Sequence, residues 1–344
     1  MLGNFLIVMI HPNSFHAWFL AARPKTLTGA IAPVLVGAAF AIRTFITSGA
    51  LSTSVISQLS PFLLCILFAV FMQIDANFIN DYFDFKKGTD REDRLGPERA
   101  CAQGWITPRA MQWGIAVMTL LSCLVGMVIL LLHLQWELLL VGLFCVIFCF
   151  LYTTHLSYLG WGDLLVLIFF GFIPVVFTHY VMTDGAWCIP LLIASFAMGL
   201  ATDNLLMVNN YRDRHQDLLS GKRTIIVRII EAQIKRLGKA EGQKRGEGIC
   251  RIIYLSLGII ATFLGIIARV LLPSHPMLAS LPHTQSVITH LLLIYLVLHA
   301  HTYRQLCTLE TSADTSIPPA ERHTNRPARA TGGSCRSRSR TPTS

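Results

Sequence analysis

The chain has 344 residues, of which 53% are hydrophobic and only 14% are charged, and its formal net charge is +9. A soluble domain usually carries about 25% charged residues, so this composition excludes an ordinary soluble globular protein. Apolar stretches long enough to cross a bilayer recur along most of the chain. Because these stretches are continuous and only helices or closed barrels satisfy their backbone in lipid, the sequence predicts an all-α polytopic membrane protein.

Eight stretches are predicted to span the membrane: 26–46, 59–79, 112–132, 134–152, 163–182, 187–209, 250–272 and 286–305. Lys and Arg concentrate between the second and third stretches and between the sixth and seventh. Connections rich in Lys and Arg stay in the cytoplasm. With Arg23 and Lys25 inside, eight spans place both basic connections and the C-terminal tail on the cytoplasmic side. The positive charge is therefore interpreted as a topology signal, and no nucleic-acid partner is expected.

Residues 1–307 are expected to form a single transmembrane domain. The tail, residues 308–344, is basic and rich in Ser, Thr and Pro, and it is predicted to be disordered because it has too few apolar residues to pack. The nine cysteines are scattered without a CxxC pair, which indicates neither a disulfide framework nor a zinc site.

Two clusters of Asn and Asp end the second and sixth predicted helices. The first consists of Asn77, Asn80, Asp81 and Asp84, and the second of Asn209, Asp213 and Asp217. Spacings of three and four residues put each cluster on one helical face. Each cluster also precedes a basic connection that contains glycine. The two lie four helices apart, and such a weak internal repeat suits a ligand shared between two halves of a bundle.

The electrostatics of these clusters call for a bound cation. Carboxylates at the C-terminal end of a helix meet the negative end of the helix dipole, and stacked carboxylates repel, each effect costing about 0.3–1 kcal/mol at a surface. A solvated acidic helix end explains one such cluster but explains two poorly. Oxygen ligands point to a hard cation such as Mg²⁺, which commonly completes its shell with water and phosphate oxygens. With basic residues immediately downstream, the clusters predict a site for metal-complexed diphosphate.

Two other features are less specific. Arg23 and Lys25 open the first helix, where they would either anchor the chain at the interface or hold an acidic substrate, and both interpretations stay open. Asp163 begins the fifth predicted helix, where a carboxylate favours the helix N-terminus, and a capping role is expected for it.

The two clusters resemble the paired aspartate-rich motifs of the UbiA superfamily of intramembrane aromatic prenyltransferases. The resemblance runs from about residue 16 to about residue 305 and is carried by Arg23–Leu27, Asn80–Asp84 with Gly88–Pro97, Gly160–Asp163 with Phe169–Gly171, and Asn209–Asp213 with Gly221–Thr224. The usual first motif has a third Asp where this chain has Gly88. The branch that prenylates 1,4-dihydroxy-2-naphthoate is similar to this chain in placing that Asp two residues later, at Asp90.

The resemblance implies Mg²⁺-dependent transfer of a polyprenyl group from an allylic polyprenyl diphosphate to 1,4-dihydroxy-2-naphthoate, with decarboxylation to demethylmenaquinone in menaquinone biosynthesis. It implies a bacterial cytoplasmic (inner) membrane protein with a cytoplasm-facing site and no obligatory protein partner. It also implies nine helices, so the last one is expected to be missing or replaced by the tail. Two alternatives stay open: a UbiA-type enzyme with another acceptor such as 4-hydroxybenzoate, and a membrane transporter.

Residue roles follow from the same resemblance. The catalytic residues are expected to be Asp81, Asp84, Asp213 and Asp217. The magnesium ligands are expected to be Asn80, Asp81, Asp84 and Asp90 at one site, and Asn209, Asp213 and Asp217 at the other. The substrate-binding residues are expected to be Arg23, Lys25, Asn77, Lys86, Arg94, Lys222 and Arg223.

Overall fold

The computed structural model describes residues 10–49, 51–88, 98–272 and 294–307, and every regular element within them is helical. In chain order the elements are α1 (Phe15–Ala22), α2 (Pro24–Thr47), α3 (Leu51–Lys87), α4 (Pro108–His133), α5 (Trp136–Leu151), the π-helical η1 (Tyr152–Leu156), α6 (Gly162–Val166), the π-helical η2 (Leu167–Phe172), α7 (Ile173–Met182), α8 (Ile189–Leu219), α9 (Ile225–Leu237) and α10 (Lys239–Val270). A further helix occupies residues 294–307.

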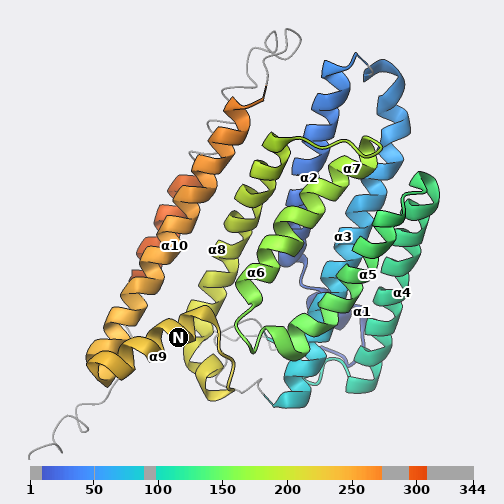
Figure 1. Cartoon of the computed structure of the whole chain (residues 1–344). Coiled ribbons are helices and arrows are strands. Elements are labelled where there is room, and N and C mark those ends of the chain that lie inside the picture. The colour runs from blue at the N-terminus through green and yellow to red at the C-terminus, as the bar shows by residue number, and fades with distance from the viewer. Residues whose placement is uncertain (1–9, 50, 89–97, 273–293, 308–344) are drawn as a thin grey trace, which may run out of the picture.

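The long helices run side by side as a bundle, and α9 lies across one of its ends (Figure 1). Seven segments in the described ranges are long and apolar enough to cross a membrane: Pro24–Thr47, Leu59–Lys87, Pro108–His133, Trp136–Leu156, Gly162–Met182, Ile189–Leu219 and Lys239–Val270. They coincide with the first seven predicted spans, which confirms the all-α polytopic fold. The eighth predicted span lies partly outside the described residues, and its described part is helical. The predicted tail lies outside them altogether.

At the end of the bundle that carries the acidic clusters, the helices extend beyond the predicted membrane spans. There α3 continues to Lys87, α8 continues to Leu219, and α10 already begins at Lys239. The long basic connection after the sixth span is therefore mostly helical. Hydropathy locates the bilayer crossing but not the helix end, since a polar helix outside the lipid persists when it packs against neighbours. Here Arg214 of α8 pairs with Glu247 of α10 at 2.9 Å.

Local sequence explains where several helices begin and turn. The Thr107 hydroxyl accepts a hydrogen bond from the backbone N–H of Ala110 at the start of α4, and Thr224 caps α9 in the same way through Val227. Gly238, at φ 83°, makes the sharp turn between α9 and α10, which a residue with a Cβ would adopt only with strain.

A close contact between backbones joins η2 to α8 in the middle of the bundle. A Cβ built on Gly171 would lie 2.7 Å from the Cα of Gly199 and 2.7 Å from the carbonyl oxygen of Ser195. Small residues let membrane helices approach in this way. Because α6, η2 and α7 form one continuous helical segment, this contact also fixes how close the start of α6 lies to α8.

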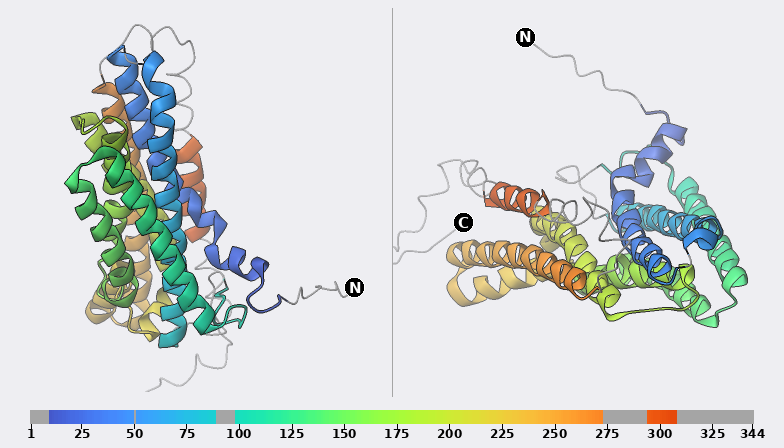
Figure 2. Two further views of the ribbon diagram at one scale, coloured as in Figure 1. Left: turned by 90° about the vertical axis from the view of Figure 1, so that its right-hand side faces the viewer. Right: turned by 90° about the horizontal axis from the view of Figure 1, so that it is seen from above.

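The helix at 294–307 packs against α8 and α10 through aromatic and polar side chains (Figure 2). The buried ring of His299 stacks on that of Tyr254 with centroids 4.3 Å apart. The Asn204 side-chain amide lies 3.1 Å from the Tyr295 hydroxyl. The described part of the eighth predicted span is therefore an integral member of the bundle.

Replacing Gly171 by Ala is expected to destabilise the protein because the new methyl group would overlap the α8 backbone. Overpacking of this kind costs about 1–3 kcal/mol, so the apparent Tm in detergent should fall. The matched control is Gly142→Ala on α5, where a Cβ would meet nothing within 4 Å and no fall in Tm is expected. Equal Tm values for the two variants would contradict the close contact.

Candidate functional site

The first acidic cluster lies on the last turns of α3, where its two Asn side chains bind neighbouring segments. Asn77 donates hydrogen bonds to the carbonyl of Ala22 at 2.9 Å and to the hydroxyl of Thr26 at 3.0 Å. Asn80 accepts one from the hydroxyl of Thr153 at 2.6 Å. These contacts hold α3 against the α1–α2 junction on one side and against η1 on the other.

Asp81 and Asp84 differ in their surroundings although they are adjacent on the helix face. Asp81 is only 1% exposed, and its two oxygens accept hydrogen bonds from the backbone N–H groups of Ala100 at 2.8 Å and Cys101 at 2.9 Å. This geometry makes Asp81 the anchor of the segment that follows α3. Asp84 is 20% exposed and pairs with Arg99 at 2.7 Å. The metal and catalytic roles predicted for both carboxylates stay predictions.

In the second cluster, the structure places Asn210 rather than Asn209 at the pocket. Asn210 is buried and lines a polar pocket, whereas Asn209 is exposed. Spacing did not separate the two, because positions three and four residues before Asp213 both share its face. Asn210 is therefore the better candidate for the role predicted for Asn209, and that role itself stays a prediction.

Both carboxylates of the second cluster have basic partners. Asp213 accepts two hydrogen bonds from Arg212, at 2.7 and 2.8 Å. Asp217 is buried and lies 3.8 Å from the Lys222 Nζ. Like the pair of Asp84 with Arg99, this pair joins an acid on the end of a helix to a base on the segment that follows it.

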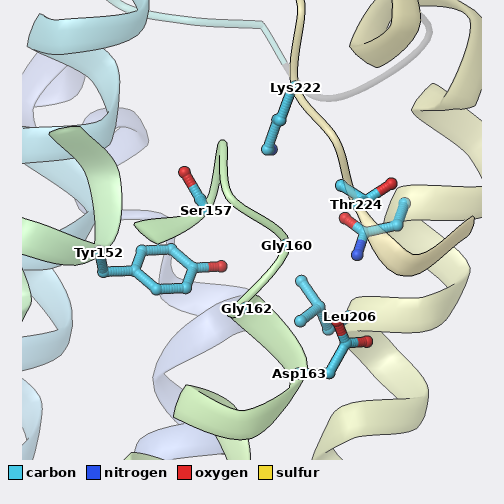
Figure 3. A pocket seen from close by; sticks show the side chains of 9 residues that line it. Tyr152, Ser157, Gly160, Gly162, Asp163, Leu206, Lys222 and Thr224 are labelled. Carbon is cyan, nitrogen blue, oxygen red and sulfur yellow. The ribbon is translucent and has the colours of Figure 1, made fainter. Parts of the chain in front are cut away.

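The polar pocket lies beside α8, at the end of the bundle where both clusters lie. It is lined by Tyr152, Ser157, Gly160, Gly162, Asp163, Leu206, Asn210, Lys222 and Thr224. In Figure 3 the Tyr152 hydroxyl points toward the Gly160–Gly162 turn, and the Lys222 side chain enters the same space from the segment after α8. Asn80 of the first cluster binds Thr153, next to the pocket-lining Tyr152, and Asp217 of the second lies 3.8 Å from the pocket-lining Lys222. Both clusters therefore contact the surroundings of this pocket.

Of two adjacent lysines at the end of α3, Lys87 makes the contacts near the pocket. Its Nζ donates a hydrogen bond to the Thr154 carbonyl at 2.9 Å and lies 3.7 Å from the centre of the Tyr158 ring. It also interacts electrostatically with Lys222. The predicted Lys86 and its neighbour Lys87 are both exposed, and the contacts of Lys87 with Thr154 and Tyr158 make it the better candidate for holding a phosphate at this position.

The remaining predicted basic residues differ in position. Arg223 has an exposed side chain, and its backbone N–H binds the Tyr158 carbonyl at 3.1 Å. Arg23 is half-buried at the α1–α2 junction, and Lys25 is exposed beside it. Asp90 and Arg94 lie outside the described residues.

The donor atoms of the two clusters suit a hard cation. Asp84, Asn210, Asp213 and Asp217 offer oxygen only, without His or Cys among them. In the ranges that the structure describes, however, no three Asp, Glu, His or Cys side chains come close enough to hold a metal ion. Mg²⁺ at either cluster would therefore need oxygens from water and from a phosphate-bearing substrate, as Mg²⁺ sites commonly do.

Sequence reasoning missed Tyr152, Ser157 and Thr224, which are neither charged nor spaced in a recognisable pattern. It also missed Asp203, a buried carboxylate one turn of α8 before the pocket-lining Leu206. That residue carried a usable signal, since an ionisable side chain within an apolar membrane span marks a functional site by default.

Comparison with known proteins shows the family of this chain. The model of the UbiA prenyltransferase family matches residues 30–306. Among curated proteins, the 1,4-dihydroxy-2-naphthoate octaprenyltransferase of Escherichia coli is 34% identical over 64% of this chain and 70% of its own length. The protein of the same name from Haemophilus influenzae is 32% identical over 62% of this chain and 68% of its own. UbiA prenyltransferase domain-containing protein 1 of Xenopus tropicalis is 30% identical over 61% and 59%.

A solved structure shares the fold. It comes from a study of digeranylgeranylglyceryl phosphate synthase in membranes, and it aligns with a TM-score of 0.50 and 16% identity over 87% of this chain and 94% of the other. With the family model covering most of the chain, the bundle and its two acidic helix ends identify the protein as a member of the UbiA prenyltransferase family.

Proposed function

We propose that this protein transfers a polyprenyl group from a polyprenyl diphosphate to 1,4-dihydroxy-2-naphthoate, with loss of the carboxylate as CO₂, to give demethylmenaquinol, the hydroquinone form of demethylmenaquinone. The proposal places it in a bacterial inner membrane with the pocket at the cytoplasmic side. The observation that carries it is the position of two acidic helix ends beside one polar pocket, with Lys222 in the pocket lining and Lys87 on the neighbouring Thr154 and Tyr158. The acceptor follows from the names of the bacterial relatives.

The charges at the pocket suit a diphosphate better than they suit an uncharged ligand. Lys87 lies over the Tyr158 ring, and Lys222 precedes Arg223, whose backbone N–H binds the Tyr158 carbonyl. An anion bound there would meet positive charge from both lysines. Arg99 and Lys222 are paired with Asp84 and Asp217. When a metal-complexed diphosphate binds, the metal ion would pair with the carboxylates and the phosphate oxygens would pair with the basic side chains. The internal ion pairs would thus be replaced by ion pairs with the ligand.

The chain's own residues would divide the work. Asp84, Asp217, Asp213 and Asn210 would hold Mg²⁺, which when bound supplies positive charge to the leaving diphosphate. Lys87 and Lys222 would bind the phosphate oxygens directly and orient the diphosphate. The apolar helix faces beyond the pocket would hold the prenyl chain away from water, which an allylic cation would otherwise capture.

Purified protein in lipid nanodiscs, given 1,4-dihydroxy-2-naphthoate, a polyprenyl diphosphate and Mg²⁺, should release diphosphate and form demethylmenaquinol, the hydroquinone form of demethylmenaquinone. EDTA should abolish product, and Asp84→Ala and Asp217→Ala should each lower kcat about 100-fold or more, as loss of a group that stabilises transition-state charge does. Asp184→Asn is the matched control, since Asp184 lies in the α7–α8 connection and contacts His133.

The alternatives give different results in this assay. Prenylation of 4-hydroxybenzoate but not of the naphthoate would keep the family and overturn the acceptor. Full activity in both Asp→Ala variants would overturn the assignment of the pocket.

Replacing Lys87 by Met should raise the KM for the polyprenyl diphosphate roughly 10- to 100-fold, because a charge-assisted hydrogen bond contributes about 1.5–3 kcal/mol. Steady-state kinetics at saturating acceptor measure this, with Lys235→Met on the exposed surface of α9 as the control. If Lys87 serves only as a clamp on Tyr158 and Thr154, the Tm will fall and the KM will not change.

A further inference from the structure

Two buried carboxylates near the pocket are not used by the function proposed above. Asp163, at the start of α6, is 8% exposed, and Asp203, on α8, is 4% exposed. In each, the Oδ1 atom is enclosed and has no hydrogen-bond partner within the described part of the chain. An unpartnered charged oxygen inside a membrane bundle is costly, so such residues are rarely retained without a ligand or a proton to bind.

One of these carboxylates lines the pocket, and the other lies on α8 just beyond it. Asp163 is one of its lining residues. Asp203 stands one turn of α8 before Leu206 and two turns before Asn210, and both of those residues also line it. Because positions 203, 206, 210, 213 and 217 repeat at intervals of three and four, Asp203 continues the stripe that carries the second acidic cluster.

The surroundings of the pair are acidic and polar. Gly162, next to Asp163, packs against Leu206 of α8, since a Cβ built on Gly162 would lie 3.5 Å from the Leu206 Cδ2 atom. Asp203 lies one turn of α8 before Leu206, so this packing brings Asp163 to the stretch of α8 that carries Asp203. Lys222 is the basic side chain among the pocket-lining residues. Two carboxylates held near each other in a dry site favour an arrangement in which a proton, or a hydrogen-bond donor from a ligand, lies between them.

Asp75 shows that burial alone does not explain this arrangement. It is 1% exposed and also has an enclosed Oδ1 without a partner among the described residues. Its other oxygen, however, accepts a hydrogen bond from Thr119 of α4 at 2.7 Å, and it lies on α3 rather than on α8. Asp75 is therefore a matched comparison for the effect of removing a buried negative charge elsewhere in the bundle.

We infer that Asp163 and Asp203 form the site that binds a hydroxyl group of the aromatic acceptor and takes up its proton during prenyl transfer. The inference rests on the proposed function in that the ligand is a hydroxyarene prenylated at this pocket. Asp203 and Asp163 are then catalytic residues for the acceptor, whereas the Asp84 and Asp217 clusters serve the diphosphate.

The step balances without any further reagent. The hydroxyl O–H bond breaks, its proton goes to the carboxylate pair, and the freed electron pair enters the ring. The ring carbon forms a bond to the allylic carbon, whose C–O bond breaks with its electron pair leaving on the diphosphate. The ring carboxylate then leaves as CO₂, its electron pair restores the aromatic ring, and the ring oxygen takes the proton back from the pair.

The test compares Asp203→Asn and Asp163→Asn with Asp75→Asn, using the hydroxyarene that the wild type prenylates. Each pocket variant should lower kcat/KM for the acceptor about 100-fold or more, the usual contribution of general acid–base catalysis. The KM for the polyprenyl diphosphate and the Mg²⁺ dependence should not change. Asp75→Asn should keep the wild-type kcat/KM, and Tm values identify any variant that fails to fold.

A second measurement uses acceptor analogues in which one hydroxyl is replaced by a methoxy group. The wild type should lose activity when the hydroxyl that binds Asp163 and Asp203 is replaced by the ether. With that ether, Asp203→Asn should be only slightly less active than the wild type, because the ether and the substitution remove the same interaction. Fully additive losses, or wild-type kcat/KM in both folded pocket variants, would overturn the inference.

The same kinetic assays distinguish a failure of this inference from a failure of the proposed function. A wild type that prenylates 4-hydroxybenzoate instead of the naphthoate overturns the proposed acceptor, and the variant comparison then decides the hydroxyl site with that acceptor. A wild type that prenylates no hydroxyarene overturns both.

Discussion

The functional end of this protein depends on the pairing of negatively charged helix ends with basic side chains. α3 and α8 each end in stacked carboxylates, where the helix dipole already places negative charge. In both cases a base from the segment just after the helix supplies the first compensation: Arg99 for Asp84, and Lys222 for Asp217. Those segments are thereby drawn back over the helix ends. The same attraction that closes the end of the bundle brings the basic residues to the place where an anionic substrate would bind.

Residues within one motif contribute in different ways. Asn77, Asn80 and Asp81 bind the α1–α2 junction, η1 and the segment at Ala100. Together they fix the end of α3 relative to three other parts of the chain. Asp84, the last of the motif, is the more exposed carboxylate of the α3 pair. An aspartate-rich motif on a membrane helix therefore contains both the residues that position the helix end and the residues available for chemistry.

α8 combines these functions along a single stripe. Asp217 and Asp213 lie at its polar end, Asn210 and Leu206 line the pocket, and Asp203 lies deeper in the bundle. The Gly171–Gly199 contact lies deeper still along α8 and holds the α6–α7 segment against it. Because packed helices are stiff, the separation of Asp163 from α8 depends on that contact. Polar groups on the far side of α8, such as Asn204 beside Tyr295, hold the helix at 294–307 in place.

The sequence by itself determined the helical membrane fold and the two acidic clusters, because both are properties of neighbouring residues. A bilayer crossing depends on about twenty consecutive apolar residues, and a shared helical face depends on spacings of three and four. Only the tertiary structure decided which neighbour in each pair lies toward the pocket: Asn210 rather than Asn209 in its lining, and Lys87 rather than Lys86 in contact with Thr154 beside it. It also decided that Tyr152 and Asp163 lie beside α8, because contacts between distant segments depend on how whole helices pack. Adjacent residues of one helix point in different directions, and the local sequence does not determine which of them faces a neighbouring helix.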